Sequence, residues 1–459
     1  MTTERLRRTA AMVGLSAFIA CSPNATAPSP PTRGSAPDPT GAASPLVLDG
    51  ANLVIVGRII TLDDPPIAEA VFIEDGLVAS VGTRDEVLAA AGDGVPILDI
   101  GDNVAYPGFI DVHSHWIGDR GYYGIDTAET AIDAAVRRGW TSISEQWVNQ
   151  ERIDELTRLA ADGALPLRVD AYLALNYDRE FFGDWYTERE PGPVDDRLRV
   201  RGLKIHLDDG WGKVINWVPG DLTAAVRRAD AAGWQVSVHA MSTAAQELAL
   251  DAFEAAIGPT GPNRLHHRVE HASQVSDDQL ARLVAMDIGV VVHLDGAADW
   301  ILDPRVIAEF DRDDPGADAD PLARWRDFVD AGLHVASATD APWTFPDLKL
   351  TDALGRPGDH IAAGMDGRVR SRPETPSWLR DQLLTADQAL RTVTLDAAWI
   401  LDDDARRGHL APGTLGDVTI LSRDVTTASP AEIRAMTVAA TIVGGIAAFC
   451  GDPRVCATR

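Results

Sequence analysis

The sequence predicts an α/β protein: a (β/α)8 TIM barrel with a small β-sandwich domain built from both chain ends. Three observations lead to this fold class. Short apolar runs alternate with helical patterns through the middle of the chain, which is the order of a parallel barrel. Strand-like runs occupy both ends, and neither set is large enough for a comfortable sheet by itself. The length of 459 residues suits a barrel of about 250 residues with additions.

The first residues are typical of bacterial export. Residues 1–20 combine an arginine-rich start with the apolar run 10–20, which is too short to span a bilayer, and we interpret them as a signal peptide. The run ends in Phe18-Ile19-Ala20-Cys21, which resembles the lipobox of bacterial lipoproteins. Cys21 is therefore the predicted lipidation site, with plain secretion as the alternative. Residues 21–45 are rich in Pro, Ala, Ser and Thr and predict a flexible linker. We expect an exported protein, periplasmic or anchored at the cell surface.

Strand patterns follow the linker and return at the end of the chain. Residues 46–105 and residues 402–459 contain short apolar or alternating runs punctuated by Gly and Asp. Together they predict one β-sandwich, with residues 106–401 inserted between its two parts. Cys450 and Cys456 form a predicted disulfide, because paired cysteines in an exported protein are expected to be oxidised. Two free thiols are the alternative.

Residues 106–401 alternate between short buried strands and helices. The predicted strands run over residues 109–112, 141–144, 167–173, 200–205, 235–239, 268–271, 288–293 and 335–340. Helical patterns lie between them, over residues 127–138, 149–162, 222–232, 244–256, 277–286 and 321–331. In such a barrel the functional side chains lie at the C-terminal ends of the strands.

Candidate metal ligands stand at these strand ends. The first strand leads into His113-Ser114-His115, and because side chains alternate along a strand, both imidazoles share one face. Neutral imidazole and carboxylate suit zinc and similar divalent metals. A single histidine here would be better explained as a hydrogen-bonded core residue, but the joint placement of these residues at converging strand ends favours a metal site. The further strand-end candidates are Lys204, His239, His271 and Asp340.

With this pattern the chain resembles the amidohydrolase superfamily, and within it the YtcJ-like (amidohydrolase-3) metal-dependent hydrolases. The resemblance covers about residues 46 to 450, and the matching stretches are 107–115, 203–210, 238–240, 268–272, 338–342, 388–398 and 408–417. Thr339 stands where the family commonly has Ser, and the stretch between His115 and Lys204 is shorter than usual. The second difference leaves the substrate preference open.

The resemblance implies a centre of two divalent metal ions, with zinc as the expected metal. Lys204 would bridge both ions as a carboxylated lysine, because burial lowers the pKa of a lysine and only the neutral amine reacts with CO₂. The implied ligands are His113, His115 and Asp340 for one ion, His239 and His271 for the other, and Lys204 between them.

The implied reaction is hydrolysis of a carbon–nitrogen bond in a small, non-peptide amide or cyclic amide. A hydroxide bridging the metals would attack the carbonyl, and Asp340 would be the catalytic residue that carries its proton to the leaving amine. One alternative is ester or lactone hydrolysis at the same centre. Another is a surface binding lipoprotein that has lost catalysis. Deamination fits less well, since superfamily deaminases typically use one metal without the bridging lysine. The net charge of −28 argues against nucleic acid as a partner.

Four further residues are predicted to contact the substrate. His206 lies two positions after Lys204 and so shares its inward face, and His293 ends the seventh strand. Trp116 and Trp343 follow ligand strands and would wall an apolar pocket, with plain packing as the alternative.

Two glutamates near the predicted ligands have different expected roles. Glu145 ends the second strand and is a candidate to orient a metal ligand. Glu270 precedes His271 and by alternation should point away from the centre, so it is given no role. The histidines without strand-end placement, which we expect to be structural, are His266, His267, His334, His360 and His409.

Overall fold

The computed structural model of the protein describes residues 52–209, 214–295, 322–341, 355–369, 374–375 and 377–456. The predicted signal peptide (1–20), the linker (21–45), Cys21 and Trp343 lie outside the described residues. Within the described ranges no helix is both long and apolar enough to pass through a bilayer.

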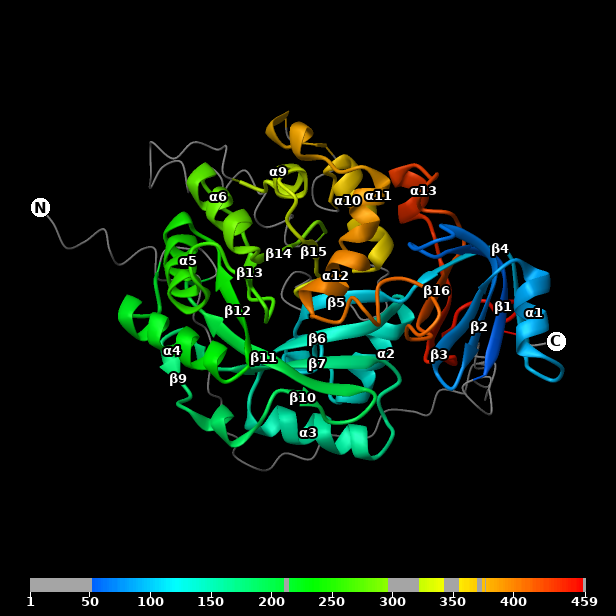
Figure 1. Ribbon diagram of the computed structural model, residues 1–459, viewed down its shortest axis with the longest axis horizontal. Helices are drawn as coiled ribbons and strands as arrows, with labels where there is room; N and C mark the ends of the chain where they lie inside the picture. Colours follow the sequence, from blue (N-terminus) through cyan, green and yellow to red (C-terminus); the bar gives the residue numbers. More distant parts are fainter. Residues whose placement is uncertain are drawn as a thin grey trace, which may run out of the picture. The chain divides into compact units, whose positions relative to one another are not determined.

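Parallel strands form a barrel in the middle of the chain (Figure 1). Each strand pairs with the next of the barrel along the chain, and the strands overlap those that the sequence predicts, although the last ends at Ser337, before Asp340. They are β5 (Phe109–Ser114), β6 (Trp140–Val148), β7 (Arg168–Ala174), β11 (Leu198–His206), β12 (Gln235–Ala240), β13 (Arg268–His271), β14 (Gly289–Val292) and β15 (Val335–Ser337). The short β10 (Gly192–Pro193) pairs antiparallel with β11. The predicted α/β fold class is confirmed.

The last and first strands meet just beyond β15. The amide of Asp340 donates to the carbonyl of His113 (2.9 Å), and the amide of His115 donates to the carbonyl of Ala341 (2.6 Å). These two hydrogen bonds bring the segment after β15 against the end of β5. They also fix Asp340 beside the two histidines through the backbone.

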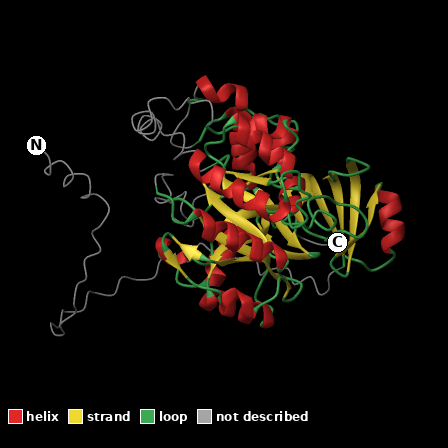
Figure 2. Ribbon diagram, turned by 60° about the vertical axis from the view of Figure 1, so that its left-hand side comes forward, coloured by secondary structure: helices red, strands yellow, loops and turns green. Residues whose placement is uncertain are grey.

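Helices lie around these strands (Figure 2). Many begin at a side-chain cap: Thr127, Asn149, Ser242, Ser276 and Thr385 each accept a hydrogen bond from a backbone amide in the first turn. The helices are α2 (Ala128–Arg137), α3 (Gln150–Ala161), α4 (Pro219–Ala231), α5 (Thr243–Ile257), α6 (Asp277–Met286), α9 (Trp325–Asp330), α10 (Pro357–Asp366), α11 (Ala386–Arg391) and α12 (Leu395–Ile400). Shorter elements are η1 (Arg120–Tyr123), η2 (Trp185–Glu188), η3 (Ser377–Gln382), and the hairpin β8 (Asn176–Tyr177) and β9 (Glu180–Phe181).

Both chain ends contribute to one domain, as the sequence predicts, but their strands pair in one seven-stranded sheet where a β-sandwich was expected. In spatial order the strands are β18 (Ile446–Cys450), β17 (Val438–Val443), β16 (Val418–Leu421), β4 (Ile97–Pro107), β1 (Leu53–Ile60), β2 (Ile67–Glu74) and β3 (Leu77–Gly82). The two ends meet where β16 pairs antiparallel with β4. Side-chain alternation gives the sheet two apolar faces. On one face, Val54 and Phe72 of the sheet form an apolar cluster with Val87 of helix α1 (Arg84–Ala91). Leu53 and Ile73 belong to a different apolar cluster. A short helix, α13 (Pro430–Arg434), precedes β17.

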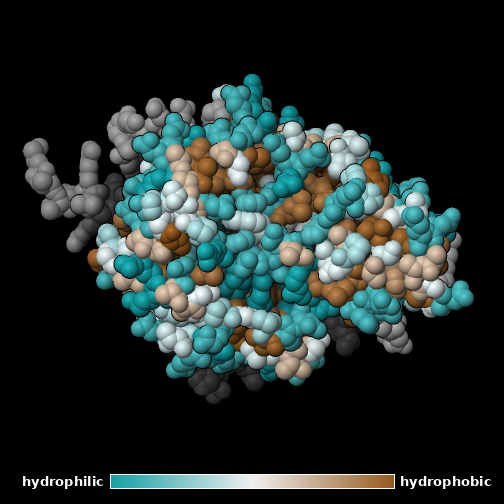
Figure 3. Space-filling view, viewed as in Figure 1, coloured by the Kyte–Doolittle hydropathy of each residue, from teal (hydrophilic) through white to brown (hydrophobic). Residues whose placement is uncertain are grey.

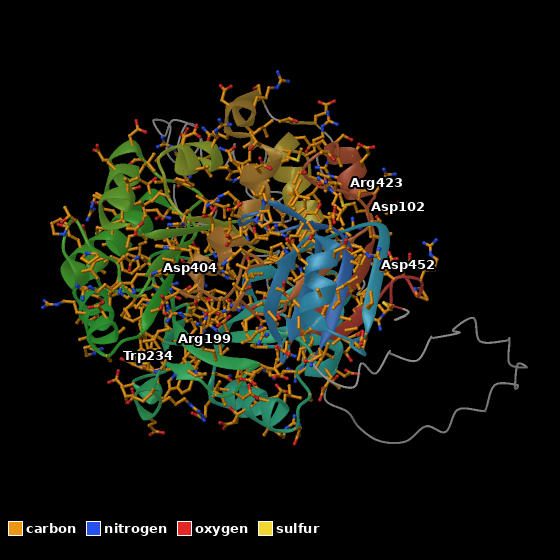
Figure 4. All side chains as sticks on the ribbon, turned by 45° about the vertical axis from the view of Figure 1, so that its right-hand side comes forward. Asp102, Arg199, Trp234, Asp404, Arg423 and Asp452 are labelled. Carbon is orange, nitrogen blue, oxygen red and sulfur yellow. A yellow bond between two sulfur atoms is a disulfide. The ribbon has the colours of Figure 1, made fainter. Side chains whose placement is uncertain are left out.

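A disulfide joins Cys450 and Cys456. The loop that it closes contains Asp452, which is labelled in Figure 4. The view of the surface in Figure 3 shows hydrophobic patches separated by hydrophilic side chains rather than one continuous apolar face.

The junction between the sheet and the barrel is held by Asp417. Its carboxylate accepts hydrogen bonds from Arg168 Nε (2.7 Å) and from the amide of Gly444 (2.8 Å). Burial would raise the pKa of Asp417, but Arg168 holds it below its usual range. The carbonyl of Asp417 accepts from the amide of Gly108, the residue between β4 and β5. Chain segments more than three hundred residues apart therefore meet at Gly108.

Substituting Gly108 with alanine should destabilise this junction. An added Cβ would lie 2.2 Å from Thr141 Oγ1 and 2.8 Å from the Cβ of Asp417, so buried atoms on both sides would have to move. We expect the free energy of unfolding to fall by about 2–3 kcal/mol, measured by urea denaturation. Gly220→Ala in α4 is the matched control, because an added Cβ there meets nothing within 4 Å; its effect should stay below about 1 kcal/mol. Equal effects of the two substitutions would contradict the expectation.

Candidate metal centre

Three ligand atoms form a nearly equilateral triangle at the C-terminal end of the barrel. His113 Nε2 and His115 Nε2 are 3.3 Å apart, and each lies 3.3 Å from Asp340 Oδ1. Both histidines are almost fully buried, and the Asp340 side chain is 15% exposed. Ligands that bind zinc tetrahedrally at about 2.0–2.1 Å are separated by about 3.3–3.4 Å. The triangle therefore fits three ligands of one metal ion.

A second group adjoins the first. His113, His271 and His293 each offer a ring nitrogen, and these nitrogens lie within 4.8 Å of one another. The Nδ1 atom of His293 lies 2.8 Å from the carbonyl of Ala338, which requires that Nδ1 carry the hydrogen. His293 Nε2 is then a lone-pair donor, and it is buried without a hydrogen-bond partner among the described residues. The sequence assigns His293 to the substrate, whereas the structure places it among possible ligands.

Lys204 lies fully buried on β11, and its amine interacts electrostatically with Glu270 and Asp340. Its Nζ atom has no hydrogen-bond partner in the part of the chain that the structure describes. Burial lowers the pKa of Lys204 to about 8, although Glu270 and Asp340 oppose the change. A buried amine without a hydrogen-bond partner destabilises the folded state, so its presence here indicates a functional role. The residue thus meets the chemical requirement for a bridging carboxylated lysine.

His239 is close to the centre but belongs to neither ligand group found among the described residues. Its ring centroid lies 4.4 Å from that of His271 and 4.3 Å from that of His206. Its Nε2 atom lies 3.3 Å from Asp208 Oδ1. Asp208 in turn accepts hydrogen bonds from the amides of Met241 and Ser242, which begin the segment after β12.

The expectation that Glu270 points away from the centre is wrong. Glu270 Oε2 lies 2.6 Å from His113 Nδ1, while its Oε1 accepts from Arg268 Nε (2.5 Å) and Ser237 Oγ (2.6 Å). Burial would raise the pKa of Glu270, but Arg268 and His113 hold it well below its usual range. The carboxylate therefore keeps a hydrogen on His113 Nδ1 and leaves Nε2 free to bind a metal.

The reason for this error lies in the backbone of His271. Its φ is +71°, a left-handed conformation that a non-glycine residue rarely adopts. This residue breaks the alternation of β13, so Glu270 and His271 both reach the interior. A signal for Glu270 was present in the sequence: Arg268 and Glu270 carry opposite charges two residues apart on one face of an otherwise apolar strand.

Two other carboxylates support the ligand segments. Glu145 accepts from the amides of Gly118 (2.6 Å) and Ile117 (3.1 Å), in the turn that follows His115. Burial raises the pKa of Glu145 to about 7, against the opposing effect of His115. This arrangement agrees with a supporting role for Glu145, acting through the loop rather than directly on the ring.

Asp111 connects the two segments that carry the triangle. It accepts from Thr339 Oγ1 (2.6 Å), from the amide of Thr339 (3.0 Å) and from Trp116 Nε1 (3.2 Å). Burial raises the pKa of Asp111 to about 6, although the Thr339 hydroxyl opposes this. Trp116 is buried, with its N–H directed at Asp111, so the structure shows it packed in the core. Its contact with a substrate stays a prediction.

His206 is buried at the C-terminal end of β11. Its Nδ1 accepts from the amide of Asp178 (3.1 Å), and its ring packs against His239 and against Trp147, which the sequence analysis did not single out. The five histidines expected to be structural belong to neither ligand group found among the described residues. His267, for example, accepts from the amide of Val236.

The comparisons with known proteins agree with this geometry. The sequence model of the amidohydrolase family matches residues 123–447. The chain is 25% identical over 259 residues to the protein of Bacillus subtilis (strain 168) named amidohydrolase YtcJ, covering 55% of this chain and 42% of that protein. It is also 25% identical over 260 residues to the N-substituted formamide deformylase of Arthrobacter pascens, covering 56% of this chain and 43% of that protein. The matches thus span less than half the length of these relatives.

A solved structure supports the fold. An uncharacterised metal-dependent hydrolase from Pyrococcus horikoshii superposes with a TM-score of 0.65 at 17% identity. The superposition covers 83% of this chain and 99% of that one.

Proposed function

The chain belongs to the amidohydrolase family, and we propose that its histidine-rich centre hydrolyses carbon–nitrogen bonds of small non-peptide amides or cyclic amides with two divalent metal ions. The observation that carries the proposal is the 3.3 Å triangle of His113, His115 and Asp340. The formamide deformylase to which the chain is similar supports an amide as the substrate, since a formamide is an amide.

The described residues fit a metal pair. His113, His115 and Asp340 would hold one ion, His271 would hold the other with His239 or His293, and carboxylated Lys204 would bridge them. Buried nitrogens of Lys204 and His293 that have no hydrogen-bond partner among the described residues support this assignment. Zinc is the expected metal, since neutral imidazole and carboxylate suit it. A bound metal pair supplies an activated water near neutral pH and polarises a carbonyl.

The residues of the chain then have separate tasks. Burial would raise the pKa of Asp340, but the two histidines hold it well below its usual range, so its carboxylate is ionised and able to accept a proton. Asp340 would take the proton of the attacking water and give it to the leaving nitrogen, yielding an acid and an amine. Glu270 would hold His113 in the tautomer that binds through Nε2.

The cellular location is part of the proposal. We infer export with a lipid anchor at Cys21, which would leave the hydrolase on a membrane surface. The disulfide between Cys450 and Cys456 supports an oxidising compartment. Labelling with radioactive palmitate, compared between the wild type and Cys21→Ser, tests the anchor separately from the catalytic centre.

A chelation experiment with matched substrates tests the reaction. Protein loaded with Zn²⁺ should contain about two metal ions per chain by mass spectrometry and should hydrolyse members of an amide panel of N-acyl amino acids, formamides and hydantoins. Dialysis against a chelator should remove both the metal and the activity, and reloading should restore both. A lactam and the lactone of the same ring size separate amide from ester hydrolysis. Turnover of the lactone alone would favour the esterase alternative. A folded protein that binds no metal would favour the binding lipoprotein.

A further inference from the structure

Aromatic rings surround one edge of the candidate metal centre. The ring centroid of Trp147 lies 5.0 Å from that of His115 and 4.8 Å from that of His206. Tyr177 lies 4.6 Å from Trp147 and stacks on His206 at 5.8 Å. Trp147 therefore lies between a candidate ligand, His115, and the rings of Tyr177 and His206. We call Trp147, Tyr177 and His206 the aromatic subsite.

The backbone at Trp147 is irregular in a way that directs its side chain. The pairing of β6 with β7 shifts register between Glu145 and Val148, so β6 carries a bulge there. Trp147 has a φ of +56°, a left-handed conformation that is rare for a large side chain. Bulges next to active sites commonly redirect one side chain. A residue held in this conformation by its surroundings is a candidate for function rather than for packing alone.

The indole nitrogen of Trp147 adds a second, independent observation. It is buried and has no hydrogen-bond partner among the described residues. Buried N–H groups without an acceptor are uncommon in folded proteins, and tryptophan usually pairs its N–H when that group is buried. An acceptor oxygen from a bound molecule would satisfy this group.

The hairpin of β8 and β9 holds Tyr177 in position. Asn176 accepts from the amide of His206 (3.0 Å) and donates to its carbonyl (2.8 Å), and the amide of Asp178 donates to His206 Nδ1. Tyr177, between these two residues, is thereby fixed over the end of β11 and remains 42% exposed. The Tyr177 side chain is thus accessible to a molecule from solvent.

We propose that the aromatic subsite binds a planar, unsaturated group of the substrate, with the Trp147 indole N–H donating to an acceptor oxygen of the same molecule. Faces and edges of aromatic rings attract one another beyond the burial of apolar area, so an aryl group would be preferred to a saturated ring of equal size. This inference rests on the proposed function in one respect, namely that the bound molecule is a substrate. Binding of the unsaturated group can be measured without any hydrolysis.

Two neutral probes separate ring chemistry from size. Benzamide and cyclohexanecarboxamide carry the same amide and differ in the saturation of the ring. Titration calorimetry with the full chain, both zinc-loaded and chelator-treated, should show benzamide binding about five- to tenfold more tightly to the wild type. Failure of benzamide to bind at about 10 mM, or equal affinities for the two probes, would overturn the proposal. Absence of hydrolysis with this preference intact would instead count against the proposed function.

Variants of Trp147 identify the residue responsible. Trp147→Phe keeps a ring but removes the N–H, so both probes should weaken by about threefold to tenfold while the preference for benzamide remains. Trp147→Leu should abolish the preference itself. Trp399→Leu is the matched control, because Trp399 also contacts two histidine rings, stacking on His266 (4.0 Å) and His334 (3.9 Å), but near the opposite ends of the strands. A preference that survives in Trp147→Leu, or that disappears in Trp399→Leu, would refute the assignment.

Discussion

Replacing Lys204 with alanine should abolish hydrolysis and reduce the bound metal from about two ions per chain to one or none. Lys204 is fully buried, and its amine has no hydrogen-bond partner among the described residues. If it bridges the metals as a carbamate, no other side chain can replace that anionic oxygen pair. We expect kcat/KM to fall at least about a thousandfold, which corresponds to about 4 kcal/mol of transition-state stabilisation. Steady-state kinetics and metal analysis of the same sample measure both effects.

A second variant separates catalysis from folding. Lys204→Met fills the same space without an amine, and a buried amine without a partner costs about 1–3 kcal/mol. The metal-free methionine variant should therefore be at least as stable to urea as the metal-free wild type, although it is inactive. Metal loading of the wild type should also depend on bicarbonate, because CO₂ forms the carbamate. A methionine variant that keeps two metals and full activity would rule out the bridge.

The positions of the barrel and of most candidate ligands were predictable because they depend on regular backbone. Strand alternation correctly places His113 beside His115 and Lys204 on the inward face of β11. Apolar runs alternating with helices determine the order of the strands, and a parallel barrel converts that order into a ring. These inferences need only the period of a strand and the direction of its neighbours.

The remaining parts of the site depend on irregular backbone. His271, Asp340 and Trp147 have φ values of +71°, +50° and +56°. Glycine is the residue that usually adopts this left-handed conformation, and none of the three is a glycine. At His271 this conformation brings two consecutive side chains inward, and at Trp147 it accompanies a bulge. Tertiary contacts enforce these conformations, so a local pattern in the sequence does not contain them. The expectation for Glu270 failed for this reason.

Ion pairs between residues far apart in the chain could not be predicted from the sequence either. Asp170 on β7 accepts from Arg199 on β11 (2.6 Å) and from Arg407 near the end of the barrel region (3.1 Å). Burial would raise the pKa of Asp170, but the two arginines lower it to about 2. Arg199 is labelled in Figure 4. Charged residues on strands are usually assigned to the surface, and only the fold shows that these three meet at the base of the barrel.

Substituting Glu270 with glutamine should weaken both the fold and the first metal position, although the side chain hardly changes shape. Arg268 is fully buried, and its ion pair with Glu270 offsets part of the cost of removing the guanidinium charge from water. Glutamine lacks the negative charge, so that cost would no longer be offset to the same extent. Breaking such a buried pair costs about 3–5 kcal/mol. Urea denaturation of the metal-free protein measures this loss. Glu247→Gln is the matched control, since Glu247 pairs with Arg282 on the surface and is 52% exposed; its cost should stay below about 0.5 kcal/mol.

The effect of Glu270→Gln on the metal follows from the hydrogen-bond roles of the new amide. Its oxygen can accept from Arg268 and Ser237, as Oε1 does now, which leaves its NH₂ group facing His113 Nδ1. His113 would then have to accept at Nδ1 and carry its hydrogen on Nε2, the atom that completes the triangle with His115 and Asp340. A nitrogen that carries a hydrogen cannot bind a metal, so the affinity for the first ion should fall about 10- to 100-fold in a chelator competition. Unchanged metal affinity in a folded glutamine variant would show that Glu270 does not set the tautomer of His113.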